Sequence, residues 1–179
     1  MVPVDDRERS ELFEQTVLPH LDSAYNLARW LAGNDHDAQD IAQEASLRAF
    51  KYFGSFRGDN PRAWLLSIVR NSFHTWLRKN RPEKTVEMTD DTLDIEDPSA
   101  GVEAVNPQFA DADAVRRAIS GLPLEFREIV ILREMEGFSY KEIAELTEVP
   151  MGTVMSRLAR ARKLLQKSLT AAFKPGDQR

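Results

Sequence analysis

The chain has 179 residues, of which 42% are hydrophobic and 30% charged, a balance typical of a globular protein with one domain or two small ones. It has no cysteine, which excludes disulfides, cysteine-based zinc sites and thiol nucleophiles. The three histidines match no metal-ligand spacing, and no apolar run approaches the roughly 20 residues of a membrane span. The acidic start lacks the apolar core of a signal peptide. We expect a cytoplasmic protein with no membrane insertion, no metal and no cofactor.

The net charge of −5 is distributed unevenly along the chain. Residues 48–81 hold eight basic residues and one acidic residue, whereas residues 82–113 hold one basic and ten acidic residues. Residues 114–179 are basic again, with twelve Lys and Arg against eight Asp and Glu. At physiological salt the field of such a block decays over about 8 Å, so each block acts on its own surroundings. Two basic blocks therefore remain candidates for binding a polyanion despite the negative total.

Apolar residues at helical spacing predict a first helix over residues 10–32 and a second from about His36 to Phe53. A third helix starts after Asn60, a capping residue, with Pro61 at its first position, and it stops near Arg81. The apolar side chains of the third helix share one broad face: Trp64, Leu65, Ile68, Val69, Phe73, Trp76 and Leu77. Because no segment alternates as a strand would, residues 1–82 are predicted to form a helical bundle.

The helical periodicity stops over residues 83–108, which are rich in acids, Thr and Pro and predict a flexible acidic linker. Order resumes near Phe109 with one helix before Pro123 and another after it. The predicted inward residues of these two helices are Val115, Ala118, Ile119, Leu122, Phe126, Ile129 and Val130. With two further helices they make a four-helix unit over residues 109–174. The predicted fold is therefore all-α, with two small helical domains joined by the linker.

Residues 139–165 predict two short helices joined by a tight turn. Ser139 and Glu142 fit a capping box at the start of the first helix, and Pro150 breaks it and suits the first turn of the second. Val154, Leu158, Ala161 and Leu165 then recur at helical spacing, which leaves outward the side chains of Thr153, Ser156, Arg157, Arg160 and Lys163. A helix with one face in a small core and a polar, basic opposite face suits the major groove of DNA.

The third helix and the loop before it also favour nucleic acid. Opposite its apolar face this helix carries Arg62, Arg70, Asn71, His74, Thr75, Arg78 and Lys79. Residues 61–81 contain no acidic residue, whereas a merely solvated face usually mixes signs. The loop offers Phe56 for stacking, Arg57 for phosphate and Asn60 for base edges, as single-strand pockets do. Burial of Phe56 in the core is an equally good alternative.

The second helix differs, because it exposes Asp37, Asp40, Gln43, Glu44 and Arg48. An acidic face repels DNA and suits a basic protein partner, although most such faces only meet water. The chain has no Gly-rich phosphate loop, nucleophile elbow or metal-ligand spacing, so we do not expect an enzyme.

Three stretches, DAQDIAQEASLRAF, FRGDNPRAWLLSIVRN and LPLEFREIVILREMEGFSYKEIAELTEVPMGTVMSRLARAR, resemble RNA polymerase sigma factors of the sigma-70 superfamily, in the extracytoplasmic-function (ECF) group. With the helix before them they cover nearly the whole chain outside the linker, and their order and spacing make the resemblance highly specific. It implies a protein that binds the clamp and flap regions of bacterial RNA polymerase core and directs it to a subset of promoters. It also implies an anti-sigma factor as a partner.

The resemblance assigns residues to three surfaces. Polymerase core binding maps onto the helix of residues 37–53, through Asp37, Asp40, Gln43, Glu44 and Arg48, with Asp40 and Gln43 at the most characteristic positions. Binding and melting of the −10 element map onto Phe56, Arg57, Asn60, Arg70, Asn71, His74, Arg78 and Lys79. The −35 element maps onto Thr153, Met155, Ser156, Arg157, Arg160 and Lys163. The family's linker lies in the active-centre cleft and RNA exit path, whose positive lining suits an acidic segment.

Three positions depart from the family's pattern, and two other functions stay open. Thr75 stands where Asp is usual, Glu148 replaces a turn glycine that takes positive φ cheaply, and Met155 replaces a Lys or Arg. One alternative is a sigma-mimic adaptor that binds an anti-sigma factor, but such adaptors carry a fused receiver domain for which these residues leave no room. The other is a stand-alone helix-turn-helix regulator, for which we would expect a dimerisation helix and no basic third helix.

Overall fold

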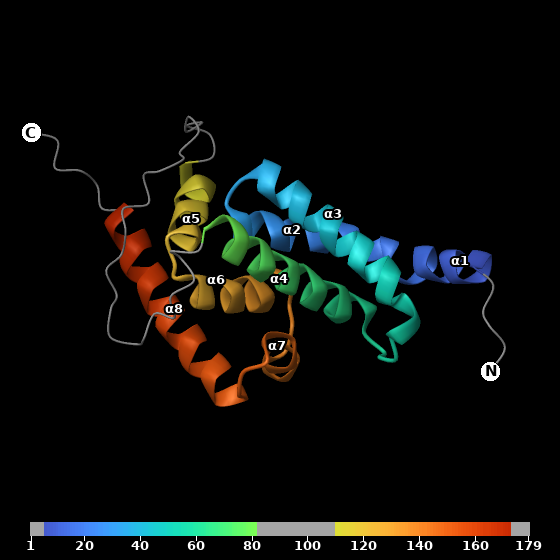
Figure 1. The fold of residues 1–179 in the computed structure, drawn as a ribbon. Helices are drawn as coiled ribbons and strands as arrows, with labels where there is room; N and C mark the ends of the chain where they lie inside the picture. The colour runs from blue at the N-terminus through green and yellow to red at the C-terminus, as the bar shows by residue number, and fades with distance from the viewer. Residues whose placement is uncertain (1–5, 82–109, 173–179) are drawn as a thin grey trace, which may run out of the picture. The chain divides into compact units, whose positions relative to one another are not determined.

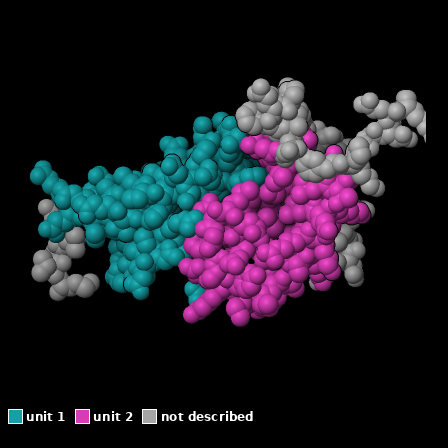
Figure 2. Space-filling model, turned by 180° about the vertical axis from the view of Figure 1, so that it is seen from behind, with its two compact units in different colours: residues 1–87, 145–148 teal, residues 88–144, 149–179 magenta. Residues whose placement is uncertain are grey.

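The computed structural model describes residues 6–81 and 110–172, and every regular element within these ranges is helical (Figure 1). The chain divides into two compact units, residues 1–87 with 145–148 and residues 88–144 with 149–179 (Figure 2). The prediction of an all-α fold with two helical regions is confirmed. The predicted linker at residues 83–108 lies outside the described residues. Among the helices of the described ranges, none has the length and apolar character needed to cross a bilayer.

Three helices, α2 (Leu21–Ala32), α3 (Asp35–Tyr52) and α4 (Pro61–Asn80), pack against one another and form the core of the first unit (Figure 1). Their largest fully buried side chains are Leu27, Ile41, Leu65, Leu66 and Val69. Five buried alanines line α2 and α3: Ala24, Ala28, Ala38, Ala45 and Ala49. Because alanine has no side chain beyond Cβ, these two helices can approach closely. Each fully buried Leu or Ile contributes about 1.5–3 kcal/mol to the stability of this core.

The prediction of a single helix over residues 10–32 is wrong. The segment instead forms α1 (Asp6–Thr16), a short 3-10 helix η1 (Leu18–His20) and α2. Pro19 lies in the first turn of η1, where its missing N–H interrupts the α-helical hydrogen bonds. Arg9 of α1 donates to the carbonyls of Phe50 and Lys51 at 2.9 and 3.0 Å, which ties α1 to the end of α3.

Local side chains fix where α3 and α4 begin. Gly33 ends α2 with a φ of +80°, and the Asn34 side chain then accepts a hydrogen bond from the Asp37 amide at 2.9 Å. Asn60 caps α4 in the same way, accepting from the Ala63 amide at 2.9 Å, and Pro61 is the first helical residue. The predicted start of the third helix is therefore confirmed, and it follows from the Asn60 cap and from Pro61 at the first helical position.

The second unit contains α5 (Ala110–Ser120), α6 (Leu124–Val130), a π-helical turn η5 (Ile131–Met135) and α8 (Met151–Ala172), with α7 (Tyr140–Thr147) preceding α8 in the chain. Helix α8 packs on α5 and α6. The prediction that Val115 points inward is wrong, because Val115 is 39% exposed while the preceding Ala114 is buried. The buried line of α5 runs through Ala114 and Ala118, one position away from Val115.

Candidate nucleic-acid interface

The first of the two helices predicted for residues 139–165 begins as the sequence predicts, and the second begins one residue after Pro150. The Ser139 amide donates to the Glu142 carboxylate at 2.8 Å, and the Glu142 amide donates to the Ser139 hydroxyl at 3.2 Å, which confirms the capping box. The Pro150 carbonyl accepts from the amides of Thr153 and Val154 at 2.9 and 3.1 Å. Pro150 therefore lies immediately before α8 and not inside its first turn.

The turn between α7 and α8 contains Glu148 with a φ of +58°, and no other non-glycine residue in the described ranges has a positive φ. The left-handed region costs an L-residue about 1–2 kcal/mol, because Cβ approaches the carbonyl oxygen. The turn thus keeps the backbone shape that a glycine would adopt there, with Glu148 under strain. Glu148, which stands where a turn glycine is usual, therefore adopts the left-handed conformation itself.

The outward face of α8 is polar and basic. Val154, Leu158 and Ala161 are buried, whereas Met155, Ser156, Arg160 and Lys163 are exposed and Thr153 is half-buried. The structure thus brings the predicted −35 residues together along one side of a single helix, opposite its buried stripe. This arrangement has the form of a major-groove reading helix.

Two cations of α8 are engaged by carboxylates from preceding elements, which sequence reasoning missed. Arg157 lies 2.9 Å from the Glu125 carboxylate of α6, and its side chain is only 28% exposed. Arg162 lies 2.6 Å from Glu134 of η5, and this hydrogen bond raises the pKa of its guanidinium. Arg157 is therefore positioned by an ion pair, in contrast to the fully outward side chain that the helical spacing predicts.

Arg127 holds the end of α5 in the second unit. Its guanidinium donates to the carbonyls of Ser120 and Leu122 at 2.6 and 3.0 Å. Burial lowers the pKa of Arg127, and the charge of neighbouring Glu128 acts in the opposite direction. These hydrogen bonds close the connection between α5 and α6, and α8 packs on both of these helices.

On α4 the predicted −10 residues border one shallow hollow. Its lining residues are Arg70, Asn71, His74, Thr75, Leu77 and Arg78, and exposed Lys79 follows in sequence. The Thr75 hydroxyl donates to the Asn71 carbonyl at 2.9 Å, so part of its hydrogen-bonding capacity serves its own helix. Arg62 instead donates to the Ser23 hydroxyl of α2 at 3.3 Å and lies outside this group. The hollow is thus a concavity of mixed polar and apolar lining that carries two arginines.

Phe56 belongs to an aromatic cluster and is half-buried. Its ring centroid lies 5.1 Å from that of Trp64 and 6.3 Å from that of Phe53. Arg57 donates to the carbonyls of Gly54 and Phe56 at 2.6 and 2.9 Å, which orders the loop before α4. Of the two alternatives for Phe56, the structure shows packing on the core with part of the ring still accessible.

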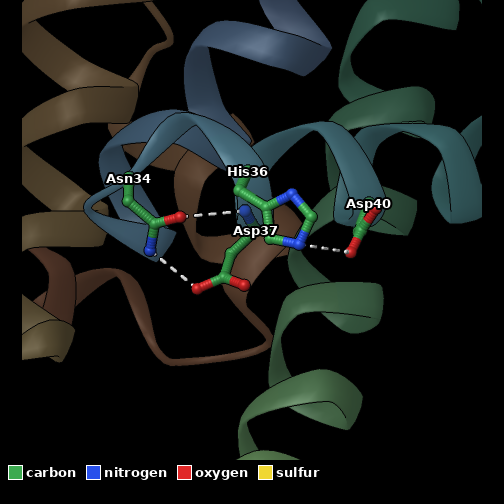
Figure 3. Close-up of polar contacts among 4 residues, drawn as sticks. All are labelled: Asn34, His36, Asp37 and Asp40. Atoms are coloured by element: carbon green, nitrogen blue, oxygen red, sulfur yellow. Dashed lines mark hydrogen bonds and ion pairs between the residues drawn. The ribbon is translucent and has the colours of Figure 1, made fainter.

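The predicted acidic face lies on α3. The Asn34 side-chain amide donates a hydrogen bond to the Asp37 carboxylate at 2.7 Å, and His36 Nε2 lies 3.8 Å from an Asp40 carboxylate oxygen (Figure 3). One turn on, Arg48 pairs with Glu44 at 2.6 Å. Leu47, which sequence reasoning missed, is 63% exposed and lies at helical spacing from Asp40, Gln43 and Glu44. The face is thus acidic with an apolar residue beside the acids.

No cluster of His, Cys, Asp or Glu side chains within the described residues could hold a metal ion.

Family models match both units. Residues 16–83 match Sigma-70 region 2, and residues 112–165 match Sigma-70, region 4. The chain is 36% identical over 158 residues to the ECF RNA polymerase sigma factor SigM of Mycobacterium tuberculosis, covering 88% of this chain and 76% of that protein. The chain belongs to the ECF RNA polymerase sigma factors.

Other relatives of this ECF sigma factor agree. It is 34% identical over 165 residues to the RNA polymerase sigma-H factor of Pseudomonas aeruginosa, covering 88% of this chain and 86% of that one. It spans 64% of the length of SigE of Mycolicibacterium smegmatis, with 32% identity and 92% of this chain covered. The sigma factor RpoE of Bartonella quintana, solved with the anti-sigma factor NepR, superposes with a TM-score of 0.68 at 30% identity, covering 88% of this chain and 96% of RpoE.

All residues predicted to contact polymerase or DNA in this ECF sigma factor lie inside the two matched regions. Residues 37–79 fall in the region 2 match, and residues 153–163 fall in the region 4 match. The sigma factors are transcription initiation factors and are not known as enzymes. The role of each individual residue stays a prediction.

Proposed function

We propose that this ECF sigma factor binds bacterial RNA polymerase core in the cytoplasm and directs it to a subset of promoters. The observation that carries the proposal is the presence, in one chain, of two basic helix faces and one acidic helix face. Each basic face lies opposite a buried stripe, on α4 and on α8. A stand-alone DNA reader has no use for the acidic face on α3. A polymerase subunit can use that face to bind the polymerase core.

Polymerase core binding is proposed for the outer face of α3. Asp40, Gln43 and Glu44 are exposed, and exposed Leu47 adds an apolar contact beside them. Asp37 and Arg48, which are half-buried and bonded within α3 and its cap, support the ends of this face. Such a surface is complementary to a basic partner with an apolar spot, because charges steer the encounter and the buried centre supplies affinity.

Binding and melting of the −10 element is proposed for the loop and the hollow on α4. Arg70, Asn71, His74 and Arg78 surround the hollow, which suits a backbone phosphate or an unstacked base. The loop contributes the accessible part of Phe56, and Arg57 and Asn60 hold its shape. An aromatic residue beside cations is the combination that single-stranded nucleic acid binds.

The −35 element is proposed to bind along α8, through Thr153, Met155, Ser156, Arg157, Arg160 and Lys163. We propose domain boundaries at residues 1–82 and 109–174, with the linker 83–108 passing through the polymerase cleft. Because that path is built for RNA, the eight acids of residues 83–108 are complementary to it. Replacing the linker acids with Ser or Asn should weaken holoenzyme assembly or alter promoter escape, and unchanged behaviour in both would contradict the linker's role.

Control by an anti-sigma factor is also proposed. The fold neighbour RpoE was solved in complex with the anti-sigma factor NepR, and it shares 30% of its sequence with this chain. We expect an anti-sigma factor for this chain to compete with polymerase or with promoter DNA for the surfaces described above.

The test is to mix the full chain with sigma-free core polymerase and promoter DNA. Specific initiation supports the proposal. Binding of an anti-sigma factor without initiation would instead support a sigma-mimic adaptor, and tight binding to duplex DNA without core would support a stand-alone regulator. Asp40→Lys should weaken core binding by roughly tenfold or more. Glu14→Lys makes the same charge change at an exposed position of α1 and should bind core normally.

A further inference from the structure

We propose that Met155, with Met151 beside it, recognises the C5-methyl group of a thymine in the −35 element. This inference rests on the proposed function, in which α8 enters the major groove, and it assigns a base preference to the position where Met155 replaces a usual Lys or Arg.

The first six residues of α8 present an uncharged surface with two apolar side chains. Met151 and Met155 lie one helical turn apart and are 51% and 49% exposed, although both are large hydrophobic residues. A Cβ placed on Gly152 between them would meet nothing within 4 Å, so the space beside the pair is open. Residues 151–156 include no charged side chain. An approaching surface would therefore meet two thioether side chains and small polar groups there.

DNA is the occupant that the rest of α8 favours. The helix carries five Lys and Arg and no acid, which complements a phosphate backbone. In helix-turn-helix readers the N-terminal residues of the second helix contact base edges, and Met151 and Met155 occupy that end. Two methionines also make a much smaller patch than the several hundred Å² that marks a protein-docking surface.

Thymine is the base that this surface can select. In the major groove only thymine presents a methyl group, whereas guanine and adenine are read through N7, O6 and N6. Methionine has no donor and only a weak acceptor, so it cannot make those contacts.

The test removes one methyl group from the DNA. Holoenzyme made from the full chain and core polymerase first selects its promoters from a library with a randomised upstream element. Each thymidine of the selected −35 element is then replaced in turn by deoxyuridine, which lacks only the C5-methyl. At one position we expect open-complex formation to fall about fourfold, as expected for losing the burial of one methyl-sized group.

Three variants assign that loss to its residue. Met155→Ala should be weaker than wild type on the thymidine promoter and insensitive to deoxyuridine at that position, whereas Met155→Leu should keep part of the sensitivity. Met135→Ala removes another exposed methionine, 44% exposed on η5, and should keep the full fourfold response. Circular dichroism checks that each variant is folded, which these surface positions favour.

The outcomes separate the inference from the proposed function. Specific initiation with no methyl-sensitive position, or with the same sensitivity in Met155→Ala, overturns the methyl contact and leaves the sigma function standing. Loss of binding to a protein partner by Met155→Ala, with normal initiation, also overturns it in favour of a docking role. Failure of the wild-type chain to initiate at any selected promoter overturns the sigma function and the inference together.

Discussion

Replacing Glu148 with glycine should stabilise the turn that precedes the reading helix α8. Glu148 has a φ of +58° in the turn before α8, which costs an L-residue about 1–2 kcal/mol. Glycine removes that strain but adds about 0.4–1 kcal/mol of conformational entropy to the unfolded chain. The net gain is therefore about 0–1.6 kcal/mol, with a midpoint near 0.8 kcal/mol. For a helical unit of about 60–100 residues, a gain near 0.8 kcal/mol raises the melting midpoint by roughly 3–6 °C.

Calorimetry of the full chain measures the shift, and hydrogen exchange of the α7 and α8 amides assigns it to this turn. Glu148→Ala is the matched control, because alanine removes the carboxylate and keeps Cβ, and it should melt within about 1–2 °C of wild type. Glu148→Asn should fall between the two, since Asn tolerates the left-handed region better than Glu. A rise for alanine equal to that for glycine would refute the strain argument and assign the effect to the lost charge.

Three further variants test other contacts. In urea unfolding, Ser72→Ala should leave the free energy of unfolding unchanged or raise it by about 1 kcal/mol, because the buried Ser72 hydroxyl has no hydrogen-bond partner among the described residues. A loss above about 1 kcal/mol would instead show that this hydroxyl makes a stabilising hydrogen bond. Arg127→Ala should lower the free energy of unfolding by about 2–4 kcal/mol, because it removes both hydrogen bonds that close the α5–α6 connection. Arg127→Lys should recover part of that loss. Equal stability of the wild type and both variants would contradict this role of Arg127. Lys163→Ala should reduce the salt dependence of holoenzyme–promoter binding by about one counterion without changing base preference, and an unchanged slope would place Lys163 away from phosphate.

Helix positions were largely predictable because their signals are local. Asn60 with Pro61, and Ser139 with Glu142, mark helix starts within four residues of sequence, and the structure shows the corresponding hydrogen bonds. The break at Pro19 was missed because the apolar spacing continues through it, with buried Phe13 and Val17 on the same stripe as α2. Periodicity records which side of a segment is buried, and it does not record whether the helix axis is continuous.

Side-chain partners were less predictable because they depend on tertiary packing. The outward position of Ser156 and Arg160 follows from helical spacing, whereas the pairing of Arg157 with Glu125 joins two helices with no local signal. The half-burial of Phe56 likewise depends on Trp64, which lies on the next helix. Leu66 was not predicted as a core residue, although it is fully buried, because α4 has neighbours on more than one side.

The back-to-back arrangement of Gly33 and Asn34 has a consequence for how the protein is made. One residue ends α2 and the next caps α3, so these helices form a hairpin, and only residues 53–60 separate α3 from α4. Contacts among the three helices are therefore close in sequence, and low contact order favours folding in microseconds to milliseconds. Synthesis adds about 5–20 residues per second, which is far slower. We expect this three-helix core to close soon after residue 81 leaves the ribosome, before α8 has been synthesised in full.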